Sequence, residues 1–371
     1  MKKTLKRIIA SRLESSVVRL LKNNPDLIVI GVAGSVGKTT TKLAIANILE
    51  QHYRVNVDEG NYNSDIGLPL SLFGLKVPDK IIDVFGWFKL LSQIDESLSR
   101  PYPYDVAVIE LGTDHPGEIA HFMRYLSPDI GVLTLIAPEH MENFKTIEAV
   151  AEEELKLLDG SRKVLINSQD SRIVNHLKSL GDKPRLTYGK GGEVHWIDDN
   201  TIKLGEDGAT IKVTPNIIGD HSRLTLLAAA CVALELKMTP SQIKAGIDAF
   251  RPVAGRMQLL PGINDSYIID DSYNSSPNAV VAALETLDKF AKSRKIALLG
   301  QMNEMGEYSA SAHIQAGKAA VGLDVLLTLG KDANNILGPA AIENGLDSSK
   351  WCQFNSPYEA GQWLKENISS K

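Results

Sequence analysis

A glycine-rich stretch near the N-terminus restricts the fold of this chain more than any other feature. The sequence GVAGSVGKTTT occupies residues 31–41, after an apolar segment at 26–33 and before a helical pattern at 38–51. A strand, a glycine-rich turn and a helix in this order are the setting of a phosphate-binding P-loop. The glycines let backbone N–H groups approach phosphate oxygens, and the helix N-terminus adds partial positive charge. We therefore expect a domain that binds a nucleotide phosphate.

The residues of this loop have distinct expected roles. Lys38 would reach the β- and γ-phosphates, and the Thr39 hydroxyl would bind Mg²⁺. The general motif has a glycine five residues before Gly37, where this chain has Val32. The alternative is a glycine-rich turn that contains Gly-Lys-Thr by chance. The expected nucleotide-binding residues of the loop are Gly34, Ser35, Gly37, Lys38, Thr39 and Thr40.

Helical and strand-like patterns alternate along most of the chain, which favours an α/β protein with parallel sheets. With 371 residues, of which 43% are hydrophobic, the chain can form two domains. The sequence RPVAG at 251–255 marks the passage between them. We expect an N-terminal helix at 1–25, a central domain at 26–253 and a C-terminal domain at 254–371. The other expected elements are strands at 106–111, 130–136, 163–167, 267–271, 295–299 and 325–329, helices at 147–158, 222–236, 278–290 and 311–321, a helix that begins at Thr239-Pro240, and short antiparallel strands within 187–215.

Two segments allow more than one interpretation. Apolar residues recur at helical spacing within 1–22, between lysines and arginines. The favoured interpretation is a helix docked on the first domain, and the alternative is a helix on a membrane surface. The segment 75–104 contains several aromatic residues, among them Phe85, Trp87 and Phe88. It is interpreted as a packed insertion, with a lipid or partner contact as the alternative.

The composition excludes several classes of protein. A net charge of −5 with mixed signs gives no basic surface for nucleic acid. The two cysteines, Cys231 and Cys352, have no metal-ligand spacing and make no disulfide framework, which favours a reducing cytoplasm. No apolar run reaches the roughly 18 residues that span a bilayer. We expect a cytoplasmic monomer.

Two polar residues follow predicted parallel strands. Glu110 lies at the C-terminal end of the strand at 106–111, and His140 follows the strand at 130–136 by a few residues. Ligands of open parallel sheets bind beyond the carboxyl ends of the strands, so both side chains are expected to face the crevice of the loop. A carboxylate and an imidazole beside a nucleotide predict Mg²⁺ or Mn²⁺. The alternative for His140 is a helix-capping or core histidine.

Together these residues resemble the Mur ligase family, over about residues 28–330, and within it the type that adds D-alanyl-D-alanine. The resemblance depends on an ordered set of motifs and not on one short match. The motifs are GSVGKTT at 34–40, which shares the family's spacing, NYNSDIGLP at 61–69, ELGTDHPGEI at 110–119, Gly255-Arg256, DDSYNSSP at 270–277 and LGQMNEMG at 299–306.

The resemblance implies a central ATP-binding domain and a smaller Rossmann-like C-terminal domain. It also implies that ATP phosphorylates a substrate carboxylate and that an amine then attacks the acyl phosphate. By resemblance, Glu110 and His140 are Mg²⁺ ligands, Arg256 contacts an ATP phosphate, and Asp271 and Asn274 lie at the ATP side of the domain interface. An interdomain salt bridge is the alternative for Arg256 and Asp271. The implied function is an ATP-dependent amide ligase of cell-wall synthesis, with ATP and Mg²⁺ as cofactors and with a peptide carboxylate and an amine as substrates.

The sequence departs from the family pattern at three places. Most members carry a carbamylated lysine that holds a second Mg²⁺, and the alignment puts Glu154 there, in EEELK at 152–156. Lys156 takes this role only if the register slips by two, and positions two apart point to different faces of a helix. A further alternative is that the three glutamates form a solvated face. The second departure is Thr225, in GDHSRLT at 219–225, which replaces an asparagine and loses the paired donor and acceptor of an amide.

The third departure concerns the family's N-terminal domain, which binds the uridine nucleotide of the substrate. Residues 1–25 are too few for such a domain. We therefore expect the N-terminal helix and the 75–104 insertion to replace it, by contacting a lipid-linked or differently capped substrate.

Competing interpretations lead to different activities. Within the ligases, a polyglutamate-type or pseudomurein-type enzyme is the variant. Outside them, the chain would be a non-catalytic nucleotide-binding partner or scaffold, or a P-loop kinase or GTPase whose phosphate transfer needs no amine. Retention of Lys38, Thr39, Glu110 and His140 favours catalysis over a scaffold.

Overall fold

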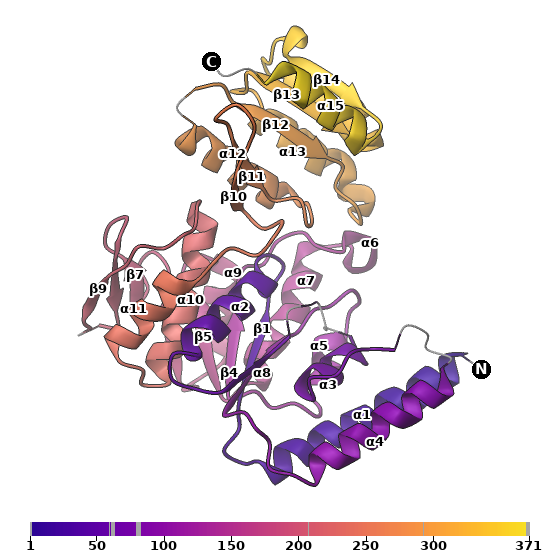
Figure 1. Ribbon diagram of the computed structural model, residues 1–371, viewed down its shortest axis with the longest axis vertical. Helices are drawn as coiled ribbons and strands as arrows, with labels where there is room; N and C mark the ends of the chain where they lie inside the picture. The colour runs from indigo at the N-terminus through magenta and orange to yellow at the C-terminus, as the bar shows by residue number, and fades with distance from the viewer. Residues whose placement is uncertain are drawn as a thin grey trace. The chain divides into compact units, whose positions relative to one another are not determined.

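The computed structural model describes residues 2–58, 60, 64–78, 83–206, 208–291 and 293–368 (Figure 1). The chain divides into two compact units. The larger comprises Met1–Ile136, Glu148–Pro215 and Leu224–Phe250, and the smaller comprises Ala137–Ile147, Asn216–Arg223 and Arg251–Lys371. Both units combine parallel strands with helices, so the predicted α/β class is confirmed.

The larger unit is built on a nine-stranded sheet of order β2-β3-β1-β4-β5-β6-β7-β8-β9. Neighbouring strands run parallel as far as β7, and the last two pairs are antiparallel. Strand β1 lies between β3 and β4, so the order of the strands reverses at β1. The loop after β1 is therefore at the topological switch point of the sheet. The strands are β1 Ile28–Ala33, β2 Val55–Val57, β3 Val106–Glu110, β4 Ile130–Leu133, β5 Lys163–Asn167, β6 Arg185–Tyr188, β7 Val194–Trp196, β8 Thr201–Leu204 and β9 Thr210–Lys212.

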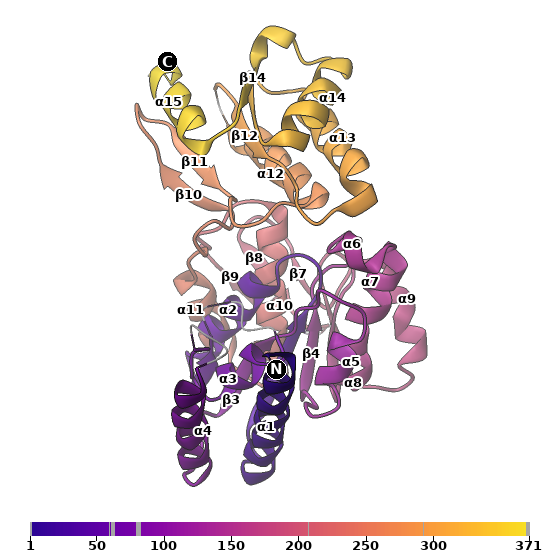
Figure 2. The same ribbon diagram turned by 90° about the vertical axis from the view of Figure 1, so that its right-hand side faces the viewer.

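Helices cover both faces of this sheet. Figure 2 shows α2, α10 and α11 on one face and α5, α7, α8 and α9 on the other. Strands β3 and β4 are buried along their whole length, as continuous apolar strands of a covered parallel sheet must be. The helices are α1 Lys2–Asn23, α2 Lys38–Leu49, α3 Gly67–Leu72, α4 Val84–Leu98, α5 Glu118–Phe122, α7 Ile147–Glu154, α8 Lys156–Gly160, α9 Ser171–His176, the 3₁₀ turn η1 Leu177–Ser179, α10 Asp220–Glu235 and α11 Pro240–Ala249.

Most predicted elements agree with the structure to within two residues, and the differences have local causes. The strand expected at 130–136 ends at Leu133, because the next residues hold the glycine-rich loop. The helix expected at 147–158 is broken at Leu155 into α7 and α8. Within 187–215, strands β7 to β9 are antiparallel as predicted, whereas β6 joins the parallel part of the sheet.

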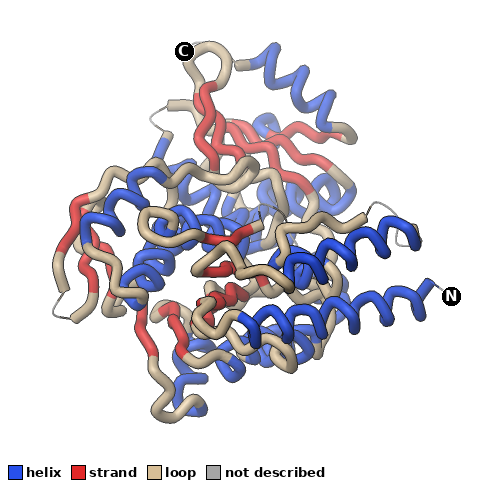
Figure 3. The backbone as a smooth tube through the Cα atoms, turned by 60° about the horizontal axis from the view of Figure 1, so that its bottom comes forward, coloured by secondary structure: helices blue, strands red, loops and turns tan. Residues whose placement is uncertain are grey.

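The N-terminal helix and the 75–104 segment pack together on the larger unit. Figure 3 shows α1 and α4 lying side by side. In α1 the apolar residues Leu13, Val17 and Leu20 are buried, and in α4 Trp87 and Ile94 are buried. Both segments are therefore packed parts of this unit. Residues 79–82, within the predicted insertion, lie outside the described residues.

The smaller unit contains a second parallel sheet, of order β12-β13-β14, and the antiparallel pair β10-β11. Its core lies between the sheet and α12, α13 and α14, and includes Leu284, Ala316, Leu326 and Leu337. Among the described residues of the chain, no helix combines the length and apolar character needed to cross a bilayer. The elements are α6 Met141–Phe144, β10 Gln258–Pro261, β11 Tyr267–Asp270, α12 Pro277–Phe290, β12 Ile296–Gly300, η2 Gly306–Tyr308, α13 Ser309–Ala319, β13 Val325–Leu329, the π-helical turn η3 Ala333–Leu337, α14 Gly338–Glu343, η4 Ser348–Lys350, β14 Trp351–Phe354 and α15 Pro357–Asn367.

Candidate functional site

The glycine-rich loop after β1 is held in place by the end of β4. The Ser35 N–H donates to the carbonyl of Leu135 at 2.7 Å, and the Thr134 hydroxyl donates to the carbonyl of Val36 at 2.7 Å. Gly34 has a φ of +121°, and a Cβ at this position would lie 2.2 Å from Thr134 Oγ1 and 3.0 Å from the Leu135 nitrogen. Only glycine fits this backbone position. The loop conformation is fixed by the hydrogen bonds to Leu135 and Thr134.

The loop ends in the first turn of α2. Gly37 is the N-cap, with a φ of 83°, and as a glycine it has no side chain that could cap the helix. The first N–H groups of a helix lack partners within the helix, and together with the helix dipole they favour an anion. Lys38 and Thr40 are half-buried in this turn, and Thr39 is buried. The turn thus presents backbone donors, an ammonium group and hydroxyl groups at one point.

Glu110 ends strand β3 beside this loop. It pairs in register with Val32 of β1, and its side chain is 3% exposed. The fully buried Lys42, from the second turn of α2, lies 3.6 Å from Glu110 Oε2. Lys42 Nζ donates instead to Asp58 Oδ1 at 3.0 Å and to the carbonyl of Gly60 at 2.8 Å. Among the described residues, Glu110 Oε2 has no hydrogen-bond partner, so this buried oxygen is available to a cation.

The surroundings of Glu110 fit Mg²⁺ better than a metal held by protein alone. Carboxylate and hydroxyl oxygens are hard ligands, and Mg²⁺ is usually bound by one or two carboxylates together with phosphate oxygens and water. In the described part of the chain, no group of three or more His, Cys, Asp or Glu side chains forms a metal site by itself. A cation at Glu110 would therefore take its remaining ligands from bound phosphate and water.

Glu154 approaches the loop from α7, which lies on the face of the sheet opposite to α2 (Figure 2). It is the last residue of α7, is fully buried, and accepts a hydrogen bond from the Gly34 N–H at 2.7 Å through Oε2. The buried Glu153 accepts from the N–H groups of Gly117 and Ile119 at the start of α5, at 2.7 and 2.6 Å. The alternative that the three glutamates form a solvated face is therefore wrong for these two. Lys156 begins α8 after the break at Leu155.

His140 is placed in the smaller unit of the chain. It precedes α6 with a left-handed φ of 48°, and its side chain forms no cap hydrogen bond with the described residues of that helix. Its Nδ1 lies 2.7 Å from Glu304 Oε2, and its Nε2 lies 3.3 Å from Glu139 Oε1. Glu110 belongs to the larger unit, so a shared Mg²⁺ site of His140 and Glu110 stays a prediction.

Three more of the predicted residues flank the antiparallel pair β10-β11 in the sequence. Asp271 Oδ1 accepts from the Met257 N–H at 3.1 Å, and the Arg256 guanidinium carbon lies 4.0 Å from the centre of the Tyr273 ring. Burial raises the pKa of Asp271 above its ordinary value. Asn274 is exposed, and its Oδ1 accepts from the Ser275 N–H at 2.9 Å. All these contacts lie within the smaller unit, so the role of these residues in binding ATP stays a prediction.

Two further motifs are placed as follows. In GDHSRLT, the His221 side chain is half-buried, its Nδ1 has no hydrogen-bond partner among the described residues, and burial lowers its pKa. Thr225 is buried in α10. In the predicted loop at 61–69, residues 61–63 lie outside the described residues, and the loop leads into α3.

Sequence reasoning missed several residues that organise this site. Lys42 had a local signal, because it follows Lys38 by one helical turn and lies within the buried face of α2. A lysine in such a place needs a negative partner. Thr134 had no comparable signal, and Glu304 lies in the motif at 299–306 but its contact with His140 joins distant segments that no local pattern connects.

Comparisons with known proteins agree with this architecture. The model of the Mur ligase middle domain matches residues 32–82 and 92–233, and the model of the Mur ligase glutamate ligase domain matches 255–369. The UDP-N-acetylmuramoyl-tripeptide–D-alanyl-D-alanine ligase of Bacillus subtilis (strain 168) is 30% identical over 359 residues, which cover 92% of this chain and 70% of that enzyme.

Solved structures resemble the chain over nearly its whole length. A crystal structure of MurF from Acinetobacter baumannii gives a TM-score of 0.77 at 23% identity, covering 98% of this chain and 74% of that one. The MurF ligase from Thermotoga maritima, in complex with ADP, gives 0.76 at 24% identity, covering 97% and 78%. At these identities the likeness establishes the fold alone.

Proposed function

The chain belongs to the Mur ligase family, and we propose that it is an ATP-dependent ligase that joins a peptide carboxylate to an amine through an acyl phosphate. We further propose UDP-N-acetylmuramoyl-tripeptide or a related peptide as the acyl substrate and D-alanyl-D-alanine as the amine. The name of the Bacillus subtilis relative supports these substrates. A cytoplasmic location, where ATP is available, and a monomeric state are part of the proposal.

One observation carries this proposal. The glycine-rich loop, the start of α2 and the buried Glu110 lie together at the ends of the neighbouring strands β1 and β3. In the proposed reaction the backbone donors of the loop and Lys38 hold the phosphates of ATP. The positive charge reduces the repulsion between the γ-phosphate and the substrate carboxylate as they approach. The carboxylate oxygen attacks the γ-phosphorus and ADP leaves. The amine then attacks the acyl carbon, and phosphate leaves as the amide forms.

A divalent cation fits this arrangement because the buried Glu110 Oε2 has no hydrogen-bond partner among the described residues. When bound, Mg²⁺ supplies electrostatic stabilisation of the charge that develops on the transferred phosphate. We propose Glu110 and Thr39 as its ligands, with His140 and Glu154 as further candidates. Arg256, Asp271 and Asn274 are proposed to contact ATP from the smaller unit.

Phosphate release from ATP and Mg²⁺ tests this function. The assay would contain a panel of muramoyl and other peptide carboxylates, each with and without D-alanyl-D-alanine, and mass spectrometry would identify the amide. Release that needs both substrates and yields the amide is the expected result. Phosphate transfer that needs no amine would indicate a kinase or GTPase instead, and ATP binding without turnover by any pair would support a non-catalytic scaffold.

A substitution at Glu154 tests whether its negative charge takes the role of the family's carbamylated lysine. Glu154→Gln keeps an acceptor for the Gly34 N–H but removes the negative charge. If the charge contributes to metal binding, we expect kcat to fall by about 10- to 100-fold. If Glu154 only anchors the loop, Glu154→Gln would match the parent protein, and only Glu154→Ala would raise the KM for ATP.

A lysine at the same position provides the complementary experiment. In Glu154→Lys, an unmodified ammonium would face the Gly34 N–H without an acceptor in a buried place, so low activity is expected. Carbamylation would restore a carboxylate, and added bicarbonate should then increase the activity of this variant alone. The same response to bicarbonate in the parent protein would contradict the assignment of this position.

A further inference from the structure

The N-terminal half of α4 exposes large apolar side chains that nothing in the ligase reaction uses. Val84, Phe85 and Phe88 are 66%, 79% and 70% exposed. The opposite face of the same helix packs against the unit through buried side chains, including Trp87 and Leu90. The helix therefore has two apolar faces, and packing within the described chain accounts for only one of them.

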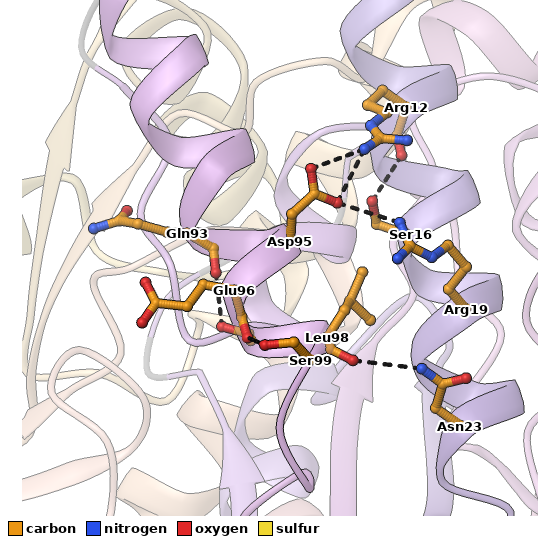
Figure 4. A network of polar contacts seen from close by, with 10 residues as sticks. Arg12, Ser16, Arg19, Asn23, Gln93, Asp95, Glu96, Leu98 and Ser99 are labelled. Atoms are coloured by element: carbon orange, nitrogen blue, oxygen red, sulfur yellow. Dashed lines mark hydrogen bonds and ion pairs between the residues drawn. The ribbon is translucent and has the colours of Figure 1, made fainter.

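The neighbouring helix α1 extends this surface. Arg12 and Arg19 of α1 contact Asp95 of α4 at 2.9 and 3.2 Å, and the Asn23 amide donates to the carbonyl of Leu98 at 3.5 Å (Figure 4). These contacts join two helices that run parallel to each other. Their first turns therefore lie at the same end of the pair, as Figures 1 and 3 also show.

The helical period places further residues on this surface. Phe88 lies two turns before Asp95 in α4, and Ile8 lies one turn before Arg12 in α1. Both are therefore on the side of the helix pair that carries the ion pair. Ile8 is 63% exposed, so the apolar surface comprises Ile8, Val84, Phe85 and Phe88. We call it the helix-pair tip.

Exposed basic side chains lie at the helix-pair tip. Lys6, Arg7 and Lys89 are exposed at this end of the two helices. The acidic residue nearest in sequence to the exposed aromatic residues, Asp83, accepts the hydrogen bond of the Gly86 N–H as the N-cap of α4. Asp95 is engaged by two arginines, and Glu14 of α1 lies 2.9 Å from His121 Nε2.

We propose that the helix-pair tip docks the protein on an anionic membrane surface. Aromatic and aliphatic side chains next to lysine and arginine are the pattern of segments that insert at the boundary of lipid headgroups and acyl chains. The basic residues would contact anionic headgroups. A second copy of the chain is a less suitable occupant, because a symmetric contact would bring Lys6, Arg7 and Lys89 of both copies together.

Vesicle sedimentation of the full chain tests this proposal. We would compare phosphatidylcholine vesicles with vesicles that contain about 30% phosphatidylglycerol. Binding to the anionic vesicles, with release at high salt, is the expected result. Phe85→Ser with Phe88→Ser should weaken it by about tenfold or more. The matched control is Ile197→Ser with Tyr358→Ser, which removes two exposed apolar side chains elsewhere and should leave binding unchanged.

Three outcomes would overturn the proposal. The first is equal binding of the parent protein and the Phe85 and Phe88 variant, and the second is no binding of the parent to anionic vesicles at low salt. The third is a dimer in light scattering that the same substitutions dissociate, since the tip would then be a contact between copies. Circular dichroism would establish that the variants are folded. Vesicle binding is independent of the ligase reaction, so a failure of either proposal can be recognised separately.

Discussion

Replacement of Lys38 by alanine is expected to lower the rate of amide formation by about a thousandfold or more. The side chain lies in the first turn of α2, next to the backbone donors of the glycine-rich loop. There the ammonium group would stabilise charge that increases between the γ-phosphate and the attacking carboxylate. A thousandfold loss corresponds to about 4 kcal/mol of transition-state stabilisation. The measurement is kcat from coupled phosphate release under saturating substrates, together with the thermal midpoint of the variant.

Two controls make this result specific. Lys212→Ala removes an exposed lysine from β9 of the same unit and should leave kcat unchanged. Lys38→Arg keeps the positive charge but changes its shape and hydrogen-bonding geometry, so only partial activity is expected. Near-parent activity of Lys38→Ala, in a protein with an unchanged thermal midpoint, would remove Lys38 from the mechanism.

The fold could be predicted from the sequence because its signals are local. The strand at 163–167 and the strand at 325–329 agree with the structure at both ends, since each is a short apolar run between polar turns. The start of α11 was also clear, because Thr239 and Pro240 form a capping sequence, and the structure has the complete capping box. Such features depend on a few neighbouring residues.

The candidate site could be predicted only in part. The loop at 34–40 has a sequence signature, whereas its supports come from Thr134 and Glu154, about a hundred residues away. Glu153 and Glu154 illustrate the difficulty. Adjacent positions of a helix point in different directions, so the pattern suggests that only one is buried. Both are buried because each accepts N–H groups from a different segment, and helical periodicity has no information about such partners.

Lys42 shows a second limit of local reasoning. Its partner Asp58 follows β2 and its partner Glu110 ends β3, and these two strands are neighbours in the sheet. The order of strands in a sheet is set by packing between distant segments, and no local pattern encodes it. The placement of Lys42 bears directly on Glu110, because it balances the carboxylate charge while donating its hydrogen bonds to Asp58 and Gly60.

Glu110→Gln is expected to lower kcat by about a hundredfold or more and to raise the Mg²⁺ concentration for half-maximal activity. Glutamine has nearly the same shape as glutamate, so the variant removes the negative charge and leaves the packing of the side chain almost unchanged. Lys42 keeps its hydrogen bonds to Asp58 and Gly60, so only a small change in the thermal midpoint is expected. The measurement is a Mg²⁺ titration of phosphate release beside a thermal melt.

The opposite variant distinguishes a metal ligand from a structural carboxylate. Lys42→Met leaves the carboxylates of Asp58 and Glu110 without their buried cation and is expected to destabilise the fold by about 3–5 kcal/mol. If Glu110 acts only as the partner of Lys42, Glu110→Gln should likewise lower the thermal midpoint and leave the Mg²⁺ titration unchanged. If Glu110 binds the metal, the titration shifts while the midpoint is nearly constant. The two measurements on the two variants therefore assign Glu110 to the reaction or to the core of the larger unit.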